Sequence, residues 1–350
     1  MTNKRWIICF QVLSLVTLAV FAGIMYVTDP LIRYGEENGL FTYYEYAQMY
    51  SNPGIARNYT YDTVLVGTSM VQNTDVQECN ELLGCDMVRL PYSGGTCYNM
   101  KTILDVCFKS DNAIKTVYWE LDEFQLFSAH DAPRYPLPEY LYREDHWGDL
   151  SYLLNLDIFY HYTLNSVLGT LRGEQQFVAR EGETLTGVFS KESALSAYPR
   201  LETPMKQVEN THYQDIVDLN LENNIIPLLE ENPETEFVFF MVPFSILYWD
   251  NEVRQGTFDA TMYSVAYALS RLLEYDNVRI YFYHDEWDIA TNLDNYKDFS
   301  HYGKWINSWM TQAIAADEGR LTKENYITVL NEMHMYVCSY DFDSIFAASS

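Results

Sequence analysis

The chain has 350 residues, and its 49 acidic and 22 basic side chains give it a formal net charge of −27 at neutral pH. A surface of this sign is repelled by the phosphates of nucleic acids, and no cluster of Lys or Arg reverses the field locally, so we expect no nucleic-acid partner. The six cysteines and seven histidines lack the spacings of metal ligands, and we expect no metal and no other cofactor.

The chain begins with an apolar segment that we interpret as a membrane anchor. Residues 6–26 contain no charged side chain and a single amide, Gln11, and as a helix they are long enough to cross a hydrocarbon core about 30 Å thick. Lys4 and Arg5 precede the segment and Asp29 follows it. The positive-inside rule therefore places the N-terminus in the cytoplasm and the chain after residue 30 outside.

A cleaved signal peptide is the alternative to an anchor, because Val20-Phe-Ala22 would serve as a cleavage site with small residues. The apolar run is longer than that of an ordinary signal peptide and continues past this site, which favours the anchor. We predict a single-pass protein of the cell membrane, with a cytoplasmic stub and anchor over residues 1–30, an extracytoplasmic domain over 31–320 and a helical extension over 321–350.

Beyond the anchor, runs of β-branched and aromatic residues alternate with stretches of helical periodicity. The sequence predicts strands over residues 62–67, 86–90, 115–121, 236–242 and 278–283. Helices are predicted over residues 96–109, 212–231 and 258–274, where apolar residues recur at spacings of three and four. This alternation is typical of an α/β fold with a doubly wound parallel sheet of five strands, in which ligands bind beyond the carboxyl ends of the strands.

An insertion of about residues 123–205 follows the third predicted strand and is rich in Tyr, Phe, Trp and Pro. We expect it to form a helical cap over the site. Exposed aromatic rings can stack on sugars, fill a core or settle at a membrane surface, and the pattern alone does not separate these roles. Glu120, Asp122 and Glu123 near its start could suggest a glycosidase pair, but neighbouring strand positions point to opposite faces and acidic residues are abundant throughout the chain.

Two short motifs at opposite ends of the predicted domain carry the side chains of a serine hydrolase. Tyr61-Asp-Thr-Val-Leu-Val-Gly-Thr-Ser69 indicates a buried strand that runs into a tight turn, and Lys297-Asp-Phe-Ser-His301 places an Asp three residues before a His. Ser69 would be the nucleophile, His301 the base that takes its proton, and Asp298 the carboxylate that sets the imidazole tautomer. Each motif alone also occurs in ordinary turns and helix caps, so the inference depends on their combination.

The two motifs, in this order, resemble those of the SGNH/GDSL hydrolase family. The resemblance covers roughly residues 60–318 and implies that Ser69 is the nucleophile and that Asp298 and His301 complete the triad. It also implies that Gly94 or Gly95, which follow the second predicted strand, supplies an N–H to the oxyanion hole. The expected fold is the SGNH-type α/β sheet.

The third motif of that family is missing here. The family usually shows Gly-x-Asn-Asp after the next strand, where this chain reads Tyr118-Trp-Glu-Leu-Asp122 without an Asn. One oxyanion donor is therefore absent unless another group replaces it, and Asn73 is a weak candidate. Removing one such donor typically costs on the order of a hundredfold or more in rate.

With the N-terminal anchor, the resemblance extends to envelope-anchored branches, such as the D-alanine-transfer protein of teichoic acid synthesis and the acetyl-transfer proteins of exopolysaccharide synthesis. It implies a serine esterase or O-acyltransferase that acts on an acylated glycopolymer or a small acyl ester, with a multispanning acyltransferase as a candidate membrane partner. The alternative is a membrane-tethered binding or assembly protein that kept the fold without the chemistry, an idea that the missing Asn supports.

Overall fold

The computed structural model describes residues 3–44, 47–174 and 186–347, and the contacts of the chain divide it into two compact units. One consists of Met1–Thr60, Asp105–Asp111 and Tyr135–Gly182, and we call it the anchor unit. The other consists of Tyr61–Leu104, Asn112–Arg134 and Glu183–Ser350, and we call it the sheet unit.

The anchor unit begins with helix α1 (Asn3–Thr28), which carries the predicted apolar segment. Among the described residues, α1 is the one helix that is long and apolar enough to cross a membrane. The unit contains further short helices: α2 (Gln48–Asn58), α6 (Glu139–Tyr142), α7 (His146–Leu153), α8 (Leu156–Ile158), the π-helical turn η2 (Phe159–Thr163) and α9 (Leu164–Arg172).

Polar contacts hold the C-terminal end of α1 to the helices that follow it. Asp29 accepts hydrogen bonds from the Tyr152 hydroxyl and from the Tyr34 N–H, both at 2.8 Å, and Arg33 pairs with Asp149 at 3.0 Å. A buried apolar cluster lies around them, made of Met25, Leu31, Leu141, Tyr152 and Ile158. Residues 135–172 of the predicted cap thus belong to the same unit as the anchor helix, and a cap over the site stays a prediction.

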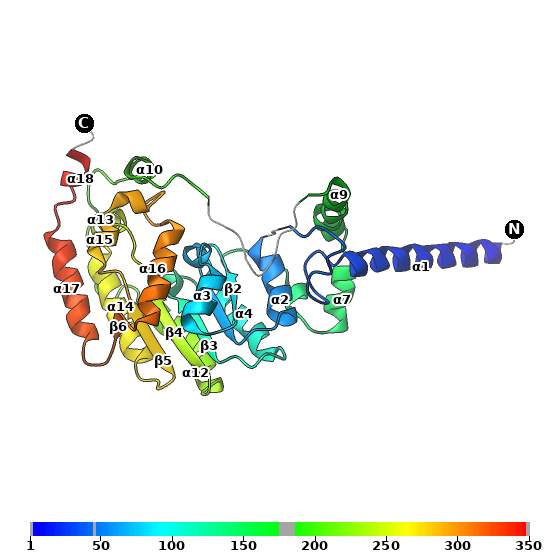
Figure 1. Ribbon diagram of the computed structural model, residues 1–350, viewed down its shortest axis with the longest axis horizontal. Helices are drawn as coiled ribbons and strands as arrows, with labels where there is room; N and C mark the ends of the chain where they lie inside the picture. The colour runs from blue at the N-terminus through cyan, green and yellow to red at the C-terminus, as the bar shows by residue number, and fades with distance from the viewer. Residues whose placement is uncertain (1–2, 45–46, 175–185, 348–350) are drawn as a thin grey trace. The chain divides into compact units, whose positions relative to one another are not determined.

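The sheet unit is an α/β structure with a six-stranded mixed sheet in the order β2-β1-β3-β4-β5-β6 (Figure 1). Its strands are β1 (Thr63–Gly67), β2 (Met87–Pro91), β3 (Thr116–Glu120), β4 (Glu236–Met241), β5 (Val278–Phe282) and β6 (Arg320–Leu321). The first five are parallel and lie within one residue of the five predicted strands. The sheet gains a sixth strand because the chain turns back at Gly319, whose φ is +75°, and β6 pairs antiparallel with β5.

Helices cover both faces of this sheet, and α3 packs against α16, α11 against α5 and α14, and α17 against α14. The helices and helical turns of the unit are η1 (Ser69–Val71), α3 (Val76–Leu83), α5 (Glu123–Phe127), α10 (Lys191–Ser196), α11 (Gln214–Asn220), η3 (Leu221–Ile225), α12 (Ile226–Glu231), α13 (Ile246–Gln255), α14 (Phe258–Leu272), α15 (Trp287–Ala290), η4 (Leu293–Asn295), α16 (Lys304–Ala315), α17 (Tyr326–Ser339) and α18 (Ser344–Ala347). Helix α4 (Cys97–Lys109) belongs to the sheet unit as far as Leu104 and to the anchor unit from Asp105. The helix predicted over 212–231 is interrupted by the π-helical turn η3, after which Pro227 occupies the first turn of α12.

The middle of the sheet is a buried aromatic core. Trp119 of β3 and Phe239 of β4 are fully buried, and their ring centres lie 5.6 Å apart. All five residues of β1 and all five of β2 are buried, as expected for parallel strands that are covered on both faces. This core makes the strands a rigid base for the loops at their carboxyl ends.

Candidate active site

The residues of both motifs meet at the carboxyl edge of the parallel strands. Gly67 of β1 lies opposite Pro91 of β2, and Met241 of β4 lies opposite Phe282 of β5, so these strands end at the same level. The loops that leave this edge carry Ser69 after β1, Gly94 after β2, Asp122 after β3, Phe244 after β4 and Asp298 after β5. The edge is where ligands bind in open parallel sheets.

A buried glutamate shapes the turn that carries Ser69. The Thr68 N–H and hydroxyl both donate to Glu120 Oε2, at 2.7 and 3.0 Å. Gly67 lets β1 approach this side chain, because a Cβ at position 67 would lie 2.7 Å from the Glu120 Cβ. Burial and the neighbouring Asp122 carboxylate raise the pKa of Glu120 well above its ordinary value.

The predicted triad residues form one continuous hydrogen-bonded chain. Ser69 Oγ lies 2.8 Å from His301 Nε2, and His301 Nδ1 lies 2.8 Å from Asp298 Oδ2 and 3.0 Å from Oδ1. The Asp298 and His301 side chains are 24% and 27% exposed, so the triad is open to a ligand without being surrounded by water. The distances suit proton transfer from a serine to a histidine whose tautomer is set by a carboxylate.

Asp298 is held in its charged form by the loop it belongs to. Burial alone would raise its pKa, but the hydrogen bonds and charge of His301 and the N–H groups of Ser300 and His301 outweigh burial and lower the pKa to about 2. Oδ1 accepts these N–H groups at 2.9 and 2.8 Å. At neutral pH a carboxylate therefore faces the imidazole.

Buried side chains tie the His301 loop to the rest of the sheet unit. The Tyr302 hydroxyl donates to the Met70 carbonyl at 3.1 Å, which links the loop directly to the Ser69 turn. Ser245 donates to the Phe299 carbonyl at 2.5 Å, and the Tyr296 hydroxyl donates to the Pro243 carbonyl at 2.7 Å. Residues that are distant in sequence thus hold the His301 loop in place.

The triad opens into a cavity of about 540 Å³, a size typical of small-molecule sites. Gly94 lines the cavity and adopts a φ of +63°, and neither its N–H nor that of Ser69 donates to any acceptor within the described parts of the chain. The Gly95 N–H donates to the Tyr92 carbonyl at 2.7 Å. Ser69 and Gly94 therefore both line the cavity with a backbone N–H that has no acceptor among the described residues.

Asn73, the predicted replacement for the third oxyanion donor, is buried and is not one of the described residues that line this cavity. Asp122, which follows β3 at the position where the resemblance led us to look for an Asn, does line it. Its Oδ1 accepts the Gln125 N–H at 2.7 Å and caps α5. Burial and the charge of Glu123, only partly offset by that N–H and by His284, raise the pKa of Asp122 to about 7.

An ion pair lies buried behind Asp122. His284 Nε2 is 2.9 Å from Glu123 Oε1, and both side chains are almost fully buried. Nδ1 of the same imidazole lies 2.5 Å from the Val242 carbonyl, so both ring nitrogens face acceptors. Burial alone would lower the pKa of His284, but Glu123 raises it above its ordinary value. Neither Glu123 nor His284 is among the described residues that line the cavity.

The cavity wall also contains residues that the motifs did not reveal. The Arg134 guanidinium lies 4.9 Å from the centre of the Phe124 ring, and its side chain lies 3.2 Å from where a Cβ of Gly94 would be. The rings of Phe244 and Tyr248 stack with centres 4.3 Å apart, and both line the cavity. Phe124 and Phe244 lie a few residues past the ends of β3 and β4, which is the one signal in the sequence that points to them.

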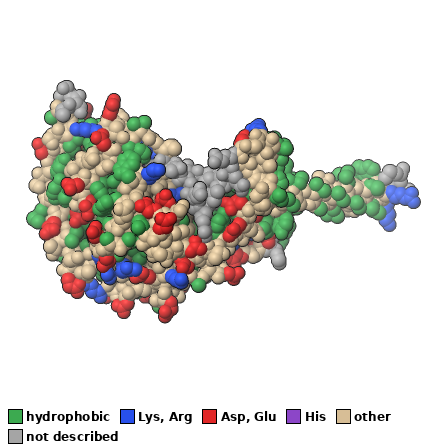
Figure 2. Space-filling view, viewed as in Figure 1, with side chains coloured by type: hydrophobic (Ala, Val, Ile, Leu, Met, Phe, Trp, Pro, Cys, Tyr) green, Lys and Arg blue, Asp and Glu red, His purple; other side chains and the backbone are tan. Residues whose placement is uncertain are grey.

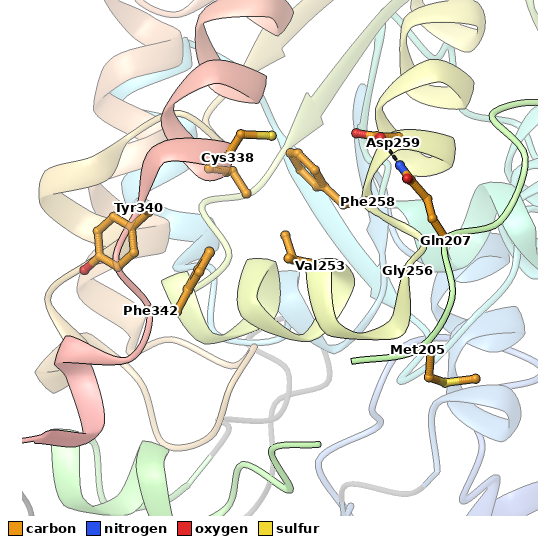
Figure 3. Close-up of a pocket in the computed structure, with 10 residues that line it drawn as sticks. Met205, Gln207, Val253, Gly256, Phe258, Asp259, Cys338, Tyr340 and Phe342 are labelled. Atoms are coloured by element: carbon orange, nitrogen blue, oxygen red, sulfur yellow. Dashed lines mark hydrogen bonds between the residues drawn. The ribbon is translucent and has the colours of Figure 1, made fainter. Parts of the chain in front are cut away.

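A second cavity, of about 450 Å³, lies in the sheet unit between α13, α14 and the end of α17 (Figure 3). Near it, His334 Nε2 lies 2.8 Å from Asp259 Oδ1, and Gln207 also donates to Asp259. Cys338 Sγ is 3.8 Å from each His334 ring nitrogen, and burial raises the pKa of the thiol. This group resembles a triad in composition, but a thiol whose pKa is raised is less ionised and therefore a weaker nucleophile than a free cysteine.

No group of three or more His, Cys, Asp or Glu side chains within the described ranges is placed to hold a metal ion. Comparisons of the chain with protein-family models, with curated proteins and with solved structures find no match. The geometry around Ser69 is therefore the feature of the molecule that points to a function.

Proposed function

We propose that this protein is a serine esterase or O-acyltransferase of the SGNH/GDSL type. The observation that carries the proposal is the chain of 2.8 Å contacts from Ser69 through His301 to Asp298, which opens into a cavity with two uncommitted backbone N–H groups. Nucleophile, base and orienting carboxylate in this arrangement constitute the acyl-transfer site that recurs on unrelated folds.

In the proposed reaction, His301 Nε2 takes the proton of Ser69 Oγ as this oxygen attacks the carbonyl carbon of an ester. The Asp298 carboxylate stabilises the imidazolium, and the N–H groups of Ser69 and Gly94 face the negative oxygen of the tetrahedral intermediate. His301 then protonates the leaving alcohol, which departs and leaves an acyl ester on Ser69. Water or a sugar hydroxyl attacks this ester, passes its proton to His301 and restores the free serine.

The cavity wall favours an acyl ester of modest size. Its aromatic side chains, Phe124, Phe244, Tyr248 and Phe299, offer apolar surface for an acyl group and flat faces for a sugar ring. An N-terminal helix that is able to cross a membrane would keep the site near envelope polymers. We therefore propose an acylated cell-envelope glycopolymer as the substrate, an extracytoplasmic sheet unit, and a multispanning acyltransferase as the partner that would supply the acyl group.

Covalent labelling of the full-length protein with a fluorophosphonate probe tests the proposal. We expect stoichiometric labelling of the native protein at Ser69, shown by peptide mass spectrometry, and loss of labelling in Ser69→Ala and His301→Ala. Ser270→Ala is the control, because among the described residues that hydroxyl bonds only to the Tyr267 carbonyl of its own helix. A folded native protein that resists the probe would refute the enzyme and support the binding or assembly protein instead.

A further inference from the structure

The helices α7 to α9 of the anchor unit present large apolar side chains to the outside. Trp147 is 71% exposed, Leu156 is 60% exposed and Leu171 is 78% exposed. Leu150, Leu154, Tyr160 and Leu168 are exposed in the same stretch. Single exposed apolar residues are ordinary, but a dense group of this kind in a chain that is otherwise strongly acidic marks an interaction surface.

The spacing of these residues shows that they form outward faces of helices. Trp147, Leu150 and Leu154 recur at intervals of three and four along α7 and its C-terminal cap, and Leu168 and Leu171 are three apart on α9. Residues at these intervals share one side of a helix. Their opposite sides are already used, since Tyr152 and Ile158 lie in the buried cluster of the unit. Helices α7 and α8 are thus apolar on two sides, which water alone does not favour.

Two members of this group, α7 and η2, pack directly against the C-terminal end of α1. The Phe21 ring of α1 lies 5.0 Å from the Phe159 ring of η2, and Met25 is fully buried in the cluster that includes Tyr152. Figure 2 shows hydrophobic side chains around the base of α1 as well as along it. The outward apolar faces are therefore continuous with the surface of the helix that could span a membrane.

The length of α1 sets the depth of these faces. Between the charged Arg5 and Phe21, where packing begins, the free apolar stretch 6–20 rises only about 22 Å at 1.5 Å per residue. A hydrocarbon core is about 30 Å thick, and tilting the helix would shorten its reach further. Some 8 Å of the core must then be spanned by the part of α1 that is already packed against α7 and η2. Those helices would have to enter the bilayer with it.

We infer that α7, α8, η2 and α9 form a membrane-embedded foot, which lies in the interface of the same bilayer that α1 crosses. Its exposed leucines reach the acyl chains, and Trp147 and Tyr160 sit at the level of the headgroups, where amphipathic rings are favoured. Interfacial helices typically sink about 5–10 Å into this boundary, which agrees with the depth required by α1. The inference goes beyond the proposed function and does not depend on Ser69.

Lipid is the occupant that the geometry favours, because continuity with α1 brings the bilayer to these faces without any further partner. A second copy of the chain or another membrane protein could cover the same leucines, and the test must separate these outcomes. We would place single nitroxide labels on the full-length protein in nanodiscs that hold one copy each, after replacing the accessible thiols of Cys9, Cys85 and Cys338.

The labels go at Leu150→Cys and Leu171→Cys, with Leu154→Cys and Leu168→Cys as second positions if either variant folds poorly. Leu82→Cys and Leu219→Cys are the matched controls, since these leucines are 44% and 42% exposed on helices of the sheet unit. The measurement is the ratio of collisions with lipid-soluble oxygen to collisions with a water-soluble nickel chelate. Circular dichroism and gel filtration establish that each variant is folded.

We expect the oxygen-to-nickel ratio at the foot positions to exceed that at the controls by several-fold, because oxygen concentrates in hydrocarbon and the chelate is excluded from it. A ratio equal to that of the controls would mean that the foot faces water and would overturn the inference. Low collision rates with both reagents would mean that protein covers these leucines, and would overturn it equally.

Discussion

The replacement Asp298→Asn gives the sharpest test of the triad, because it changes charge and hydrogen bonding at almost constant shape. An Asn oxygen can still accept the N–H groups of Ser300 and His301, which Asp298 Oδ1 binds at 2.9 and 2.8 Å, so the loop should keep its fold. The Asn NH₂ group then occupies the place of Oδ2, 2.8 Å from His301 Nδ1. It donates to that nitrogen and leaves the imidazole proton on Nε2, which can no longer accept from Ser69.

The expected loss is large in rate and modest in stability. Wrong-tautomer variants of serine triads lose about 10⁴-fold in kcat, which corresponds to about 5.5 kcal/mol at the transition state. The Asp298 pKa of about 2, against an ordinary 3.8, corresponds to about 2 kcal/mol of folding stability at neutral pH. This contribution is present above about pH 4 and is lost as the pH falls through about 2, so the variant should unfold a few degrees lower at pH 7.

Hydrolysis of 4-nitrophenyl acetate by the full-length protein would measure the first effect, and thermal unfolding the second. Asp288→Asn is the control, since this carboxylate is exposed on α15 and does not touch the triad. A folded Asp298→Asn protein that keeps more than a tenth of the native kcat would refute the argument, because His301 would then find its tautomer without Asp298.

Two further predictions concern the turn and the cavity. Gly67→Ala places a Cβ 2.7 Å from the Glu120 Cβ, and we expect a loss of about 1–3 kcal/mol in urea unfolding together with at least a tenfold drop in fluorophosphonate labelling rate. Gly35→Ala is the control, because a Cβ there meets no atom within 4 Å beyond its chain neighbours, and it should leave the stability and the labelling rate unchanged. Equal losses of stability and labelling rate in the two variants would disprove the steric role of Gly67. Because the pKa of Asp122 is raised to about 7, the native state binds more protons than the unfolded state between about pH 4 and 7, so this residue makes stability fall as pH rises through that window. Asp122→Asn retains the helix cap and should lose this dependence of stability on pH. Urea unfolding of both proteins at pH 5 and pH 8 measures it, and an equal change of stability between the two pH values in both proteins would contradict a raised pKa of Asp122.

The parallel strands could be predicted from sequence because their signal is local and strong. Segments such as Val64-Leu65-Val66 are continuous apolar runs, which is what a strand buried on both faces requires. Strand β6 is different, because two residues are too few to show alternation and its pairing depends on the left-handed turn at Gly319. The helix predicted from residue 321 begins only at Tyr326, since the Asn325 side chain accepts the Thr322 N–H at 2.7 Å and closes a turn there instead.

In the candidate site too, residues with a local sequence signal could be predicted, and residues placed only by the fold could not. Ser69, Asp298 and His301 could be singled out because turn chemistry and a spacing of three residues are visible in the chain, and the structure brings them within hydrogen-bonding distance. Arg134 and Tyr248 could not, because only the fold determines which side chains reach the cavity. Whether Gly94 or Gly95 has an uncommitted N–H likewise depends on one turn hydrogen bond, from Gly95 to the Tyr92 carbonyl.

Ser69 and His301 are separated by 232 residues of chain, and under the proposed mechanism this separation has a consequence for biosynthesis. A ribosome that adds about 5–20 residues per second needs about 10–50 s to pass from the serine codon to the histidine codon. Throughout that interval the nascent chain carries a serine with no base to activate it. Under the proposed mechanism, a chain that terminates before His301 would contain Ser69 without its base and would be inert towards esters.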